Sequence, residues 1–182
     1  MKTHPSLRQI RALLILFITG LVISGLTAFP IETQLRFAHR FVTQLGWHNE
    51  LTHWLEKVYQ GVAVTNAQYP FMAYGTDWLA FAHIVIAIAF IGPLRNPVRN
   101  VWVVEFGIIS CMAIFPLAFI AGHIRGIPLV WQCIDCSFGV FGGALLFIIW
   151  RKIKRLENEP HFGDHVSKTR EFFPVQRDAM AD

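Results

Sequence analysis

The sequence predicts an all-α integral membrane protein, a four-transmembrane-helix bundle with an amphipathic helical hairpin on the non-cytoplasmic side. Its 182 residues are 54% hydrophobic and only 15% charged, whereas an ordinary soluble domain has about 25% charged residues. The apolar residues include 16 Phe and 6 Trp, more than a soluble core of this size can bury, so most of them must face lipid. The composition excludes a disordered chain, a secreted disulfide scaffold and a nucleic-acid-binding domain, despite a net charge of +4.

Stretches with at most one charge each locate four spans, which we expect near residues 10–29, 74–94, 98–122 and 128–150. Each has about the 20 mostly apolar residues that a helix needs to cross the hydrocarbon core. The uncharged run in the first span is longer than the ~7–15 apolar residues of a signal peptide, and no small-residue cleavage site follows it. We therefore interpret the first span as an uncleaved anchor.

The distribution of Lys and Arg predicts the orientation of the spans. Three such residues precede the first span, two lie in the turn at 95–99 and four lie in 151–155. The long loop 30–73 and the turn at Arg125 together hold four, spread over a greater length. Because cytoplasmic segments carry the excess of Lys and Arg, both termini are expected in the cytoplasm.

This orientation sets the expected organisation of the chain. Residues 1–150 form a membrane domain, and residues 151–182 form a cytoplasmic tail that we expect to be flexible beyond Pro160. The expected location is a bacterial-type inner (plasma) membrane, with the chain as a multi-pass protein.

The loop 30–73 has the pattern of two amphipathic helices rather than of a slack connection. In its first half, apolar residues recur at helical spacing, and Gly46 is placed to end the helix. These residues are Ile31, Leu35, Ala38, Val42 and Leu45. The second half has a similar stripe, with Asn49 placed to cap it: Leu51, Trp54, Leu55, Val58 and Val62. We expect a hairpin at the outer interface or over the mouth of the bundle, either packing only or acting as a lid.

Ionisable and thiol side chains inside the spans are the candidate functional residues, because polar groups are unfavourable in a membrane and are often functional there. With the expected topology they gather in the outer parts of the second, third and fourth spans. The candidate metal ligands are Asp77, His83, His123, Cys133, Asp135 and Cys136.

Several chemistries fit these residue types, and the sequence leaves them open. Thiolate and imidazole ligands suit Zn or Cu, so a metal ion is the candidate cofactor. Haem is disfavoured because His123 is about two turns shallower than His83. The C-x-x-C pair, Cys133 and Cys136, also suits thiol redox exchange, although no second pair accompanies it. A metal-dependent hydrolase would use Asp and His from several helices, but paired-His spacing is missing.

The same residues have a purely structural interpretation. Asp135 would pair with Arg125, or accept a hydrogen bond from Trp131 or His83. Glu105, near the cytoplasmic end, would pair with Arg95 or Arg99.

Three glycines of the fourth span, Gly139, Gly142 and Gly143, would form a close-packing face. Together with the scarcity of polar groups, these features favour a non-catalytic subunit or accessory or assembly protein of a membrane complex. The expected partners are the lipid bilayer and other membrane protein subunits, and no nucleic acid. The alternative is a metal- or redox-active membrane protein with its site in the outer leaflet.

Overall fold

The computed structural model describes residues 5–47 and 49–158, and within these ranges the chain is helical with no strand. The elements are α1 (Pro5–Ala28), α2 (Ile31–Gln44), α3 (Glu50–Gln68), η1 (Pro70–Ala73), α4 (Tyr74–Ala89), α5 (Ile91–Arg95), α6 (Val101–Ile124) and α7 (Leu129–Glu157). The expected tail beyond Pro160 lies outside the described residues.

Four segments of the described chain are long and apolar enough to cross a membrane: Ser6–Ala28, Pro70–Arg95, Val101–Ile124 and Leu129–Glu157. The predicted all-α membrane fold with four spanning helices is therefore confirmed, and the protein is a multi-pass membrane protein. The last helix is longer than the apolar run alone indicates, because the basic residues from Arg151 to Arg155 form its final turns.

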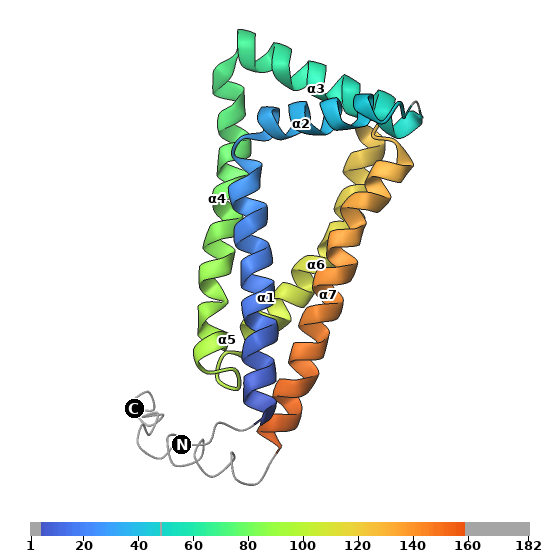
Figure 1. Ribbon diagram of the computed structural model, residues 1–182. Coiled ribbons are helices and arrows are strands. Elements are labelled where there is room, and N and C mark those ends of the chain that lie inside the picture. The colour runs from blue at the N-terminus through green and yellow to red at the C-terminus, as the bar shows by residue number, and fades with distance from the viewer. Residues whose placement is uncertain (1–4, 48, 159–182) are drawn as a thin grey trace, which may run out of the picture.

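The four spanning helices form two pairs, α1 with α4 and α6 with α7. Figure 1 shows that the two pairs meet at one end and diverge toward the other. We call the end where they meet the closed end, because the main buried core lies there. This core joins the start of α1, the end of α4, the start of α6 and the end of α7. It consists of Ile10, Leu14, Phe90, Val103, Val104, Leu146, Ile149, Ile153 and Leu156.

Glycines bring the helices of each pair into close contact. A Cβ atom added to Gly139 of α7 would lie 2.8 Å from the carbonyl oxygen of Cys111 in α6, too close for any side chain. Gly142 and Gly143 also face Cys111, at 3.3 and 3.4 Å. The predicted close-packing face is thus confirmed. In the other pair, Gly25 of α1 plays the same part against α4.

A hydrogen bond ties α6 to α7 near the closed end. The indole Nε1 of Trp150 donates to Oε1 of Glu105 at 2.9 Å. The expected partners Arg95 and Arg99 were the wrong choice, because the antiparallel packing brings Trp150 to the depth of Glu105. An indole satisfies the carboxylate without removing a second charge from water.

The segment between the first two spans is a helical hairpin, α2 followed by α3. Gly46 ends α2 in the left-handed conformation (φ +65°), and the N–H of Trp47 donates to the carbonyl of Val42 at 3.4 Å. The side chain of Asn49 caps α3 by accepting a hydrogen bond from the N–H of Thr52 at 3.1 Å. Both terminating residues were predicted from the sequence, and both predictions are confirmed.

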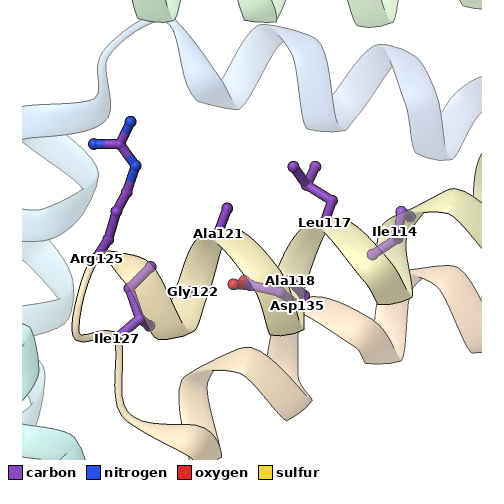
Figure 2. Close-up of a pocket in the computed structure, with 8 residues that line it drawn as sticks. All are labelled: Ile114, Leu117, Ala118, Ala121, Gly122, Arg125, Ile127 and Asp135. Carbon is purple, nitrogen blue, oxygen red and sulfur yellow. The ribbon is translucent and has the colours of Figure 1, made fainter.

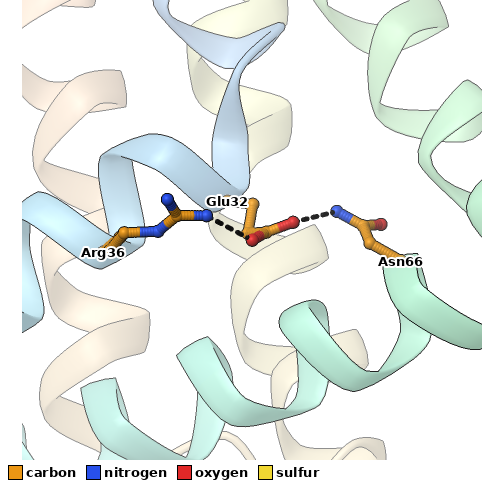
Figure 3. A network of polar contacts seen from close by, with 3 residues as sticks. All are labelled: Glu32, Arg36 and Asn66. Atoms are coloured by element: carbon orange, nitrogen blue, oxygen red, sulfur yellow. Dashed lines mark hydrogen bonds and ion pairs between the residues drawn. The ribbon is translucent and has the colours of Figure 1, made fainter.

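Polar contacts brace α2 against α3, and Figure 3 shows one set of them. Glu32 of α2 accepts hydrogen bonds from Arg36 at 2.7 Å and from Asn66 of α3 at 3.0 Å. These bonds, that of Asn66 first, hold the pKa of Glu32 below its ordinary value of 4.5. Further along, His39 forms an ion pair with Glu56 and stacks on the ring of Tyr59, with centroids 5.3 Å apart. The hairpin crosses the end of the molecule where the helix pairs diverge (Figure 1), which we call the hairpin end.

Candidate functional site

The turn between α6 and α7, at the hairpin end, is fixed by local contacts. Gly126 has φ +65°, and the N–H of Ile127 donates to the carbonyl of Gly122 at 2.9 Å. Gln132 of α7 is buried, and its Nε2 donates to the carbonyl of Ile127 at 2.7 Å. Its side chain lies where a Cβ of Gly122 would be, 2.8 Å away. The ends of the two helices are thereby held in one geometry.

A pocket of about 240 Å³ lies along this pair of helices. Ala118, Ala121 and Gly122 of α6 are its small residues, Arg125 stands at its hairpin end, and Asp135 reaches it from α7 (Figure 2). We call this pocket the α6–α7 groove. All of its lining residues are Ile114, Leu117, Ala118, Ala121, Gly122, Arg125, Ile127 and Asp135.

The groove holds two opposite charges. Arg125 and Asp135 are both exposed, and within the described ranges neither side chain forms a hydrogen bond or an ion pair. The predicted proximity of these two residues is found, since they line one groove, but the predicted pairing between them is not. Trp131, one turn before Asp135 on the same face of α7, also differs from expectation. Its indole N–H is buried and has no hydrogen-bond partner in the described part of the chain.

The groove is open on the side that faces the other helix pair. In Figure 2, Leu117, Ala121 and Arg125 extend from α6 on the side where α1 passes. The side chain of Leu117 is 66% exposed, because the divergence of the two pairs leaves it without a neighbour there.

The candidates on α4 lie away from this groove. Asp77 is in the first turn of α4 and is half-buried. The Nδ1 atom of His83 lies 2.8 Å from the carbonyl oxygen of Leu79. A carbonyl oxygen only accepts, so Nδ1 is the donor in this contact. In the described residues His83 contacts the carbonyl of its own helix, α4, and forms no hydrogen bond with Asp135, contrary to the prediction.

The remaining candidates are on α6 and α7. His123 is exposed in the last turn of α6, Cys133 is exposed and Cys136 is buried, and both cysteines are free thiols. Across the described residues, no three His, Cys, Asp or Glu side chains form a group able to hold a metal ion. Of the six candidates, only Asp135 lines the groove.

Two features of the site were missed in the sequence. Arg125 was used only in the prediction of orientation and as a partner for Asp135, although a single cation between two long apolar runs is a usable signal for a site. Phe37 and Phe41 of α2 are 70% and 62% exposed. At about 100° per residue they lie nearly opposite His39, hence on the side of α2 away from α3. Their i, i+4 spacing was the available signal.

No family model, no curated protein and no solved structure matches this chain.

Proposed function

We propose that the protein is a non-catalytic subunit or accessory or assembly protein of a membrane complex, and that the α2–α3 hairpin is the part its partner contacts. The observation that carries this proposal is the bracing of the hairpin. A connection that only joined two spans would need no contacts between its halves. Here the halves are joined by a hydrogen bond, an ion pair and a ring stack, from Glu32 and His39 to Asn66, Glu56 and Tyr59.

The braced hairpin presents a polar side away from the membrane domain. In Figure 1, α3 lies farther from the closed end than α2. The only buried residue of α3 is Leu55, and the residues nearly opposite it on the helix are exposed. These are His53, Lys57, Gln60 and Val64. A rigid face that is polar apart from one apolar residue suits binding to a partner protein. The same face is also compatible with water when no partner is bound.

Polar groups inside the spans support a structural role as well. Glu105 of α6 bonds Trp150 of α7, Gln132 bonds the turn before its own helix, and His83 bonds its own helix. Asn100 likewise donates to the carbonyl of Gly92 at 3.1 Å, holding the turn between α5 and α6. These groups stabilise the arrangement of the helices, as expected for a framework protein.

We further infer that the closed end faces the cytoplasm of a bacterial-type inner membrane. Basic residues gather there, on α1, α5 and α7 and in the turn before α6, including Arg11, Arg95, Arg99 and Arg151. The bias of Lys and Arg toward the cytoplasmic side supports this orientation.

The proposal is tested by site-specific photo-crosslinking in cells. A photoreactive residue at Val64, on the outward side of α3, is expected to give an adduct with one protein of defined mass. The matched control is Ile109 of α6, which is also exposed and apolar and is expected to give lipid adducts only. Replacing both Glu32 and Asn66 by Ala should reduce the Val64 adduct. A lone chain after mild detergent extraction, with no protein adduct from Val64, would contradict the proposal.

The metal- or redox-active alternative makes a separate prediction. It requires a stoichiometric metal in the purified protein, or a reversible change in thiol titre at Cys133 and Cys136. Elemental analysis and thiol titration measure both directly.

A further inference from the structure

We propose that the α6–α7 groove binds one phospholipid of the leaflet on the hairpin side, whose headgroup carries both a phosphate and a primary ammonium group. Arg125 would hold the phosphate, Asp135 would hold the ammonium, and the apolar walls would hold the upper part of an acyl chain. The inference does not depend on the proposed function, because it rests on α6 and α7 rather than on the hairpin.

The charges of the groove identify the headgroup. Arg125 and Asp135 line one pocket, and in the described chain neither has a polar partner. Unpaired charges at the edge of a membrane are unfavourable, so a ligand that satisfies both is favoured over one that satisfies either alone. A guanidinium binds phosphate through directed N–H donors, and a carboxylate accepts from an ammonium group.

The dimensions of the groove fit half of a bilayer. From Ile114 to its C-cap Arg125, the groove follows the last twelve positions at the end of α6, eleven rises or roughly 16 Å at 1.5 Å per residue. The hydrocarbon core is about 30 Å thick, so this length matches one leaflet. One part of the groove is lined by the small residues Ala118, Ala121 and Gly122. The apolar side chains of Ile114 and Leu117 line the rest of its α6 wall.

The fold favours a lipid over a transmembrane helix of a partner. The core joins the helix pairs at one end of the molecule, and the hairpin crosses the other end (Figure 1). A helix that crosses the membrane beside the groove would meet α2 and α3, whereas a lipid enters from the side and needs only one leaflet. The exposed Phe37 and Phe41, on the side of α2 away from α3, add apolar surface to the hairpin.

The test uses the full chain in nanodiscs and in mild detergent, with native mass spectrometry of bound lipid. Wild-type protein is expected to retain one phosphatidylethanolamine in preference to phosphatidylglycerol, which lacks the cation, and to phosphatidylcholine, whose cation has no N–H donor. Arg125→Gln is expected to weaken retention of every phospholipid about tenfold, the effect of losing one charge-assisted bond. Asp135→Asn should instead abolish the preference for the primary ammonium. Lys57→Gln, on the hairpin, is the matched charge-removing control and should change neither.

Two further measurements keep the test decisive. The thermal unfolding midpoint of each variant distinguishes a loss of lipid binding from a loss of folding. The headgroup preference is measured on the wild-type protein, so it does not depend on whether any variant folds. Equal retention of the three lipids by wild-type protein would overturn the proposal. So would a photoreactive residue at Leu117 that gives an adduct with a protein in place of a lipid. If the lipid test fails but the photoreactive residue at Val64 still gives a protein adduct, the proposed accessory function is retained.

Discussion

At the scale of single residues, small and polar side chains decide how the spanning helices meet. Gly139 is required because the atom it faces, the carbonyl oxygen of Cys111, belongs to a backbone that cannot move aside. Gly20 of α1 has no atom within 4 Å of its Cβ position and carries no such constraint. Both glycines look alike in the sequence. A packing face was predictable from the cluster at 139–143, but its partner on α6 was not.

The hydrogen bond from Trp150 to Glu105 leads to a prediction at this scale. Trp150→Phe removes the donor and leaves a half-buried carboxylate without it, which we expect to destabilise the protein by about 1–3 kcal/mol. Thermal unfolding in detergent measures the effect. The matched control is Trp102→Phe, because Trp102 is 61% exposed and should change the midpoint little. In the double variant with Glu105→Gln, most of the loss should be recovered. Equal effects of the two Trp substitutions would show that the bond contributes nothing.

At the scale of elements, the sequence predicted what is encoded locally. Charge-free runs located the four spanning helices, and Gly46 and Asn49 marked the end of α2 and the start of α3. Side-chain pairings between elements were not predictable in this way. One apolar stripe was predicted for α2, from Ile31 to Leu45, yet the structure shows a second and exposed apolar side with Phe37 and Phe41. The periodicity of apolar residues identifies an apolar face but not the neighbour that covers it. A face that contacts lipid and a face that contacts the protein core have the same pattern.

The bracing of the hairpin predicts a pH dependence. The pKa of Glu32 is lowered by Asn66 and Arg36, so its contribution to hairpin stability is full above the ordinary value of 4.5 and is lost as the pH falls through the lower folded value. We expect the protection factors of α2 and α3 amides, taken against the intrinsic exchange rate at each pH, to decrease as the pH falls across that window. Asn66→Ala should move this decrease to higher pH, because the folded pKa of Glu32 returns toward the ordinary value.

Glu157→Gln is the control for this series, since Glu157 lies at the closed end, far along the chain from the hairpin. It should leave the exchange profile of the hairpin unchanged. A profile that is the same in wild-type protein and in Asn66→Ala would show that Glu32 does not brace the hairpin.

At the scale of the whole molecule, the chain is a pair of helix pairs rather than a bundle packed along its full length. The large buried core is confined to the closed end, and the opposite end is crossed by a braced hairpin. Composition predicted the four spans because hydrophobicity alone determines them. The divergence of the pairs depends on which helices share close-packing residues. Gly25 joins α1 to α4 and Gly139 joins α6 to α7, whereas the contact of α1 with α7 lies mainly at the core. The groove exists because of this divergence, and no local pattern encodes it.

The orientation of the molecule in the membrane can be measured with the lysines already present. Lys57 is exposed on the hairpin, whereas Lys152 and Lys154 lie in the final turns of α7 at the closed end. If the basic end faces the cytoplasm, a membrane-impermeant amine reagent added to intact spheroplasts should modify Lys57 and spare the other two. All three should react after the membrane is permeabilised, which shows that protection comes from the bilayer rather than from the fold. Modification of Lys152 and Lys154 in intact cells, with Lys57 spared, would reverse the orientation. The hairpin and the groove would then face the cytoplasm, and the phospholipid would come from the inner leaflet.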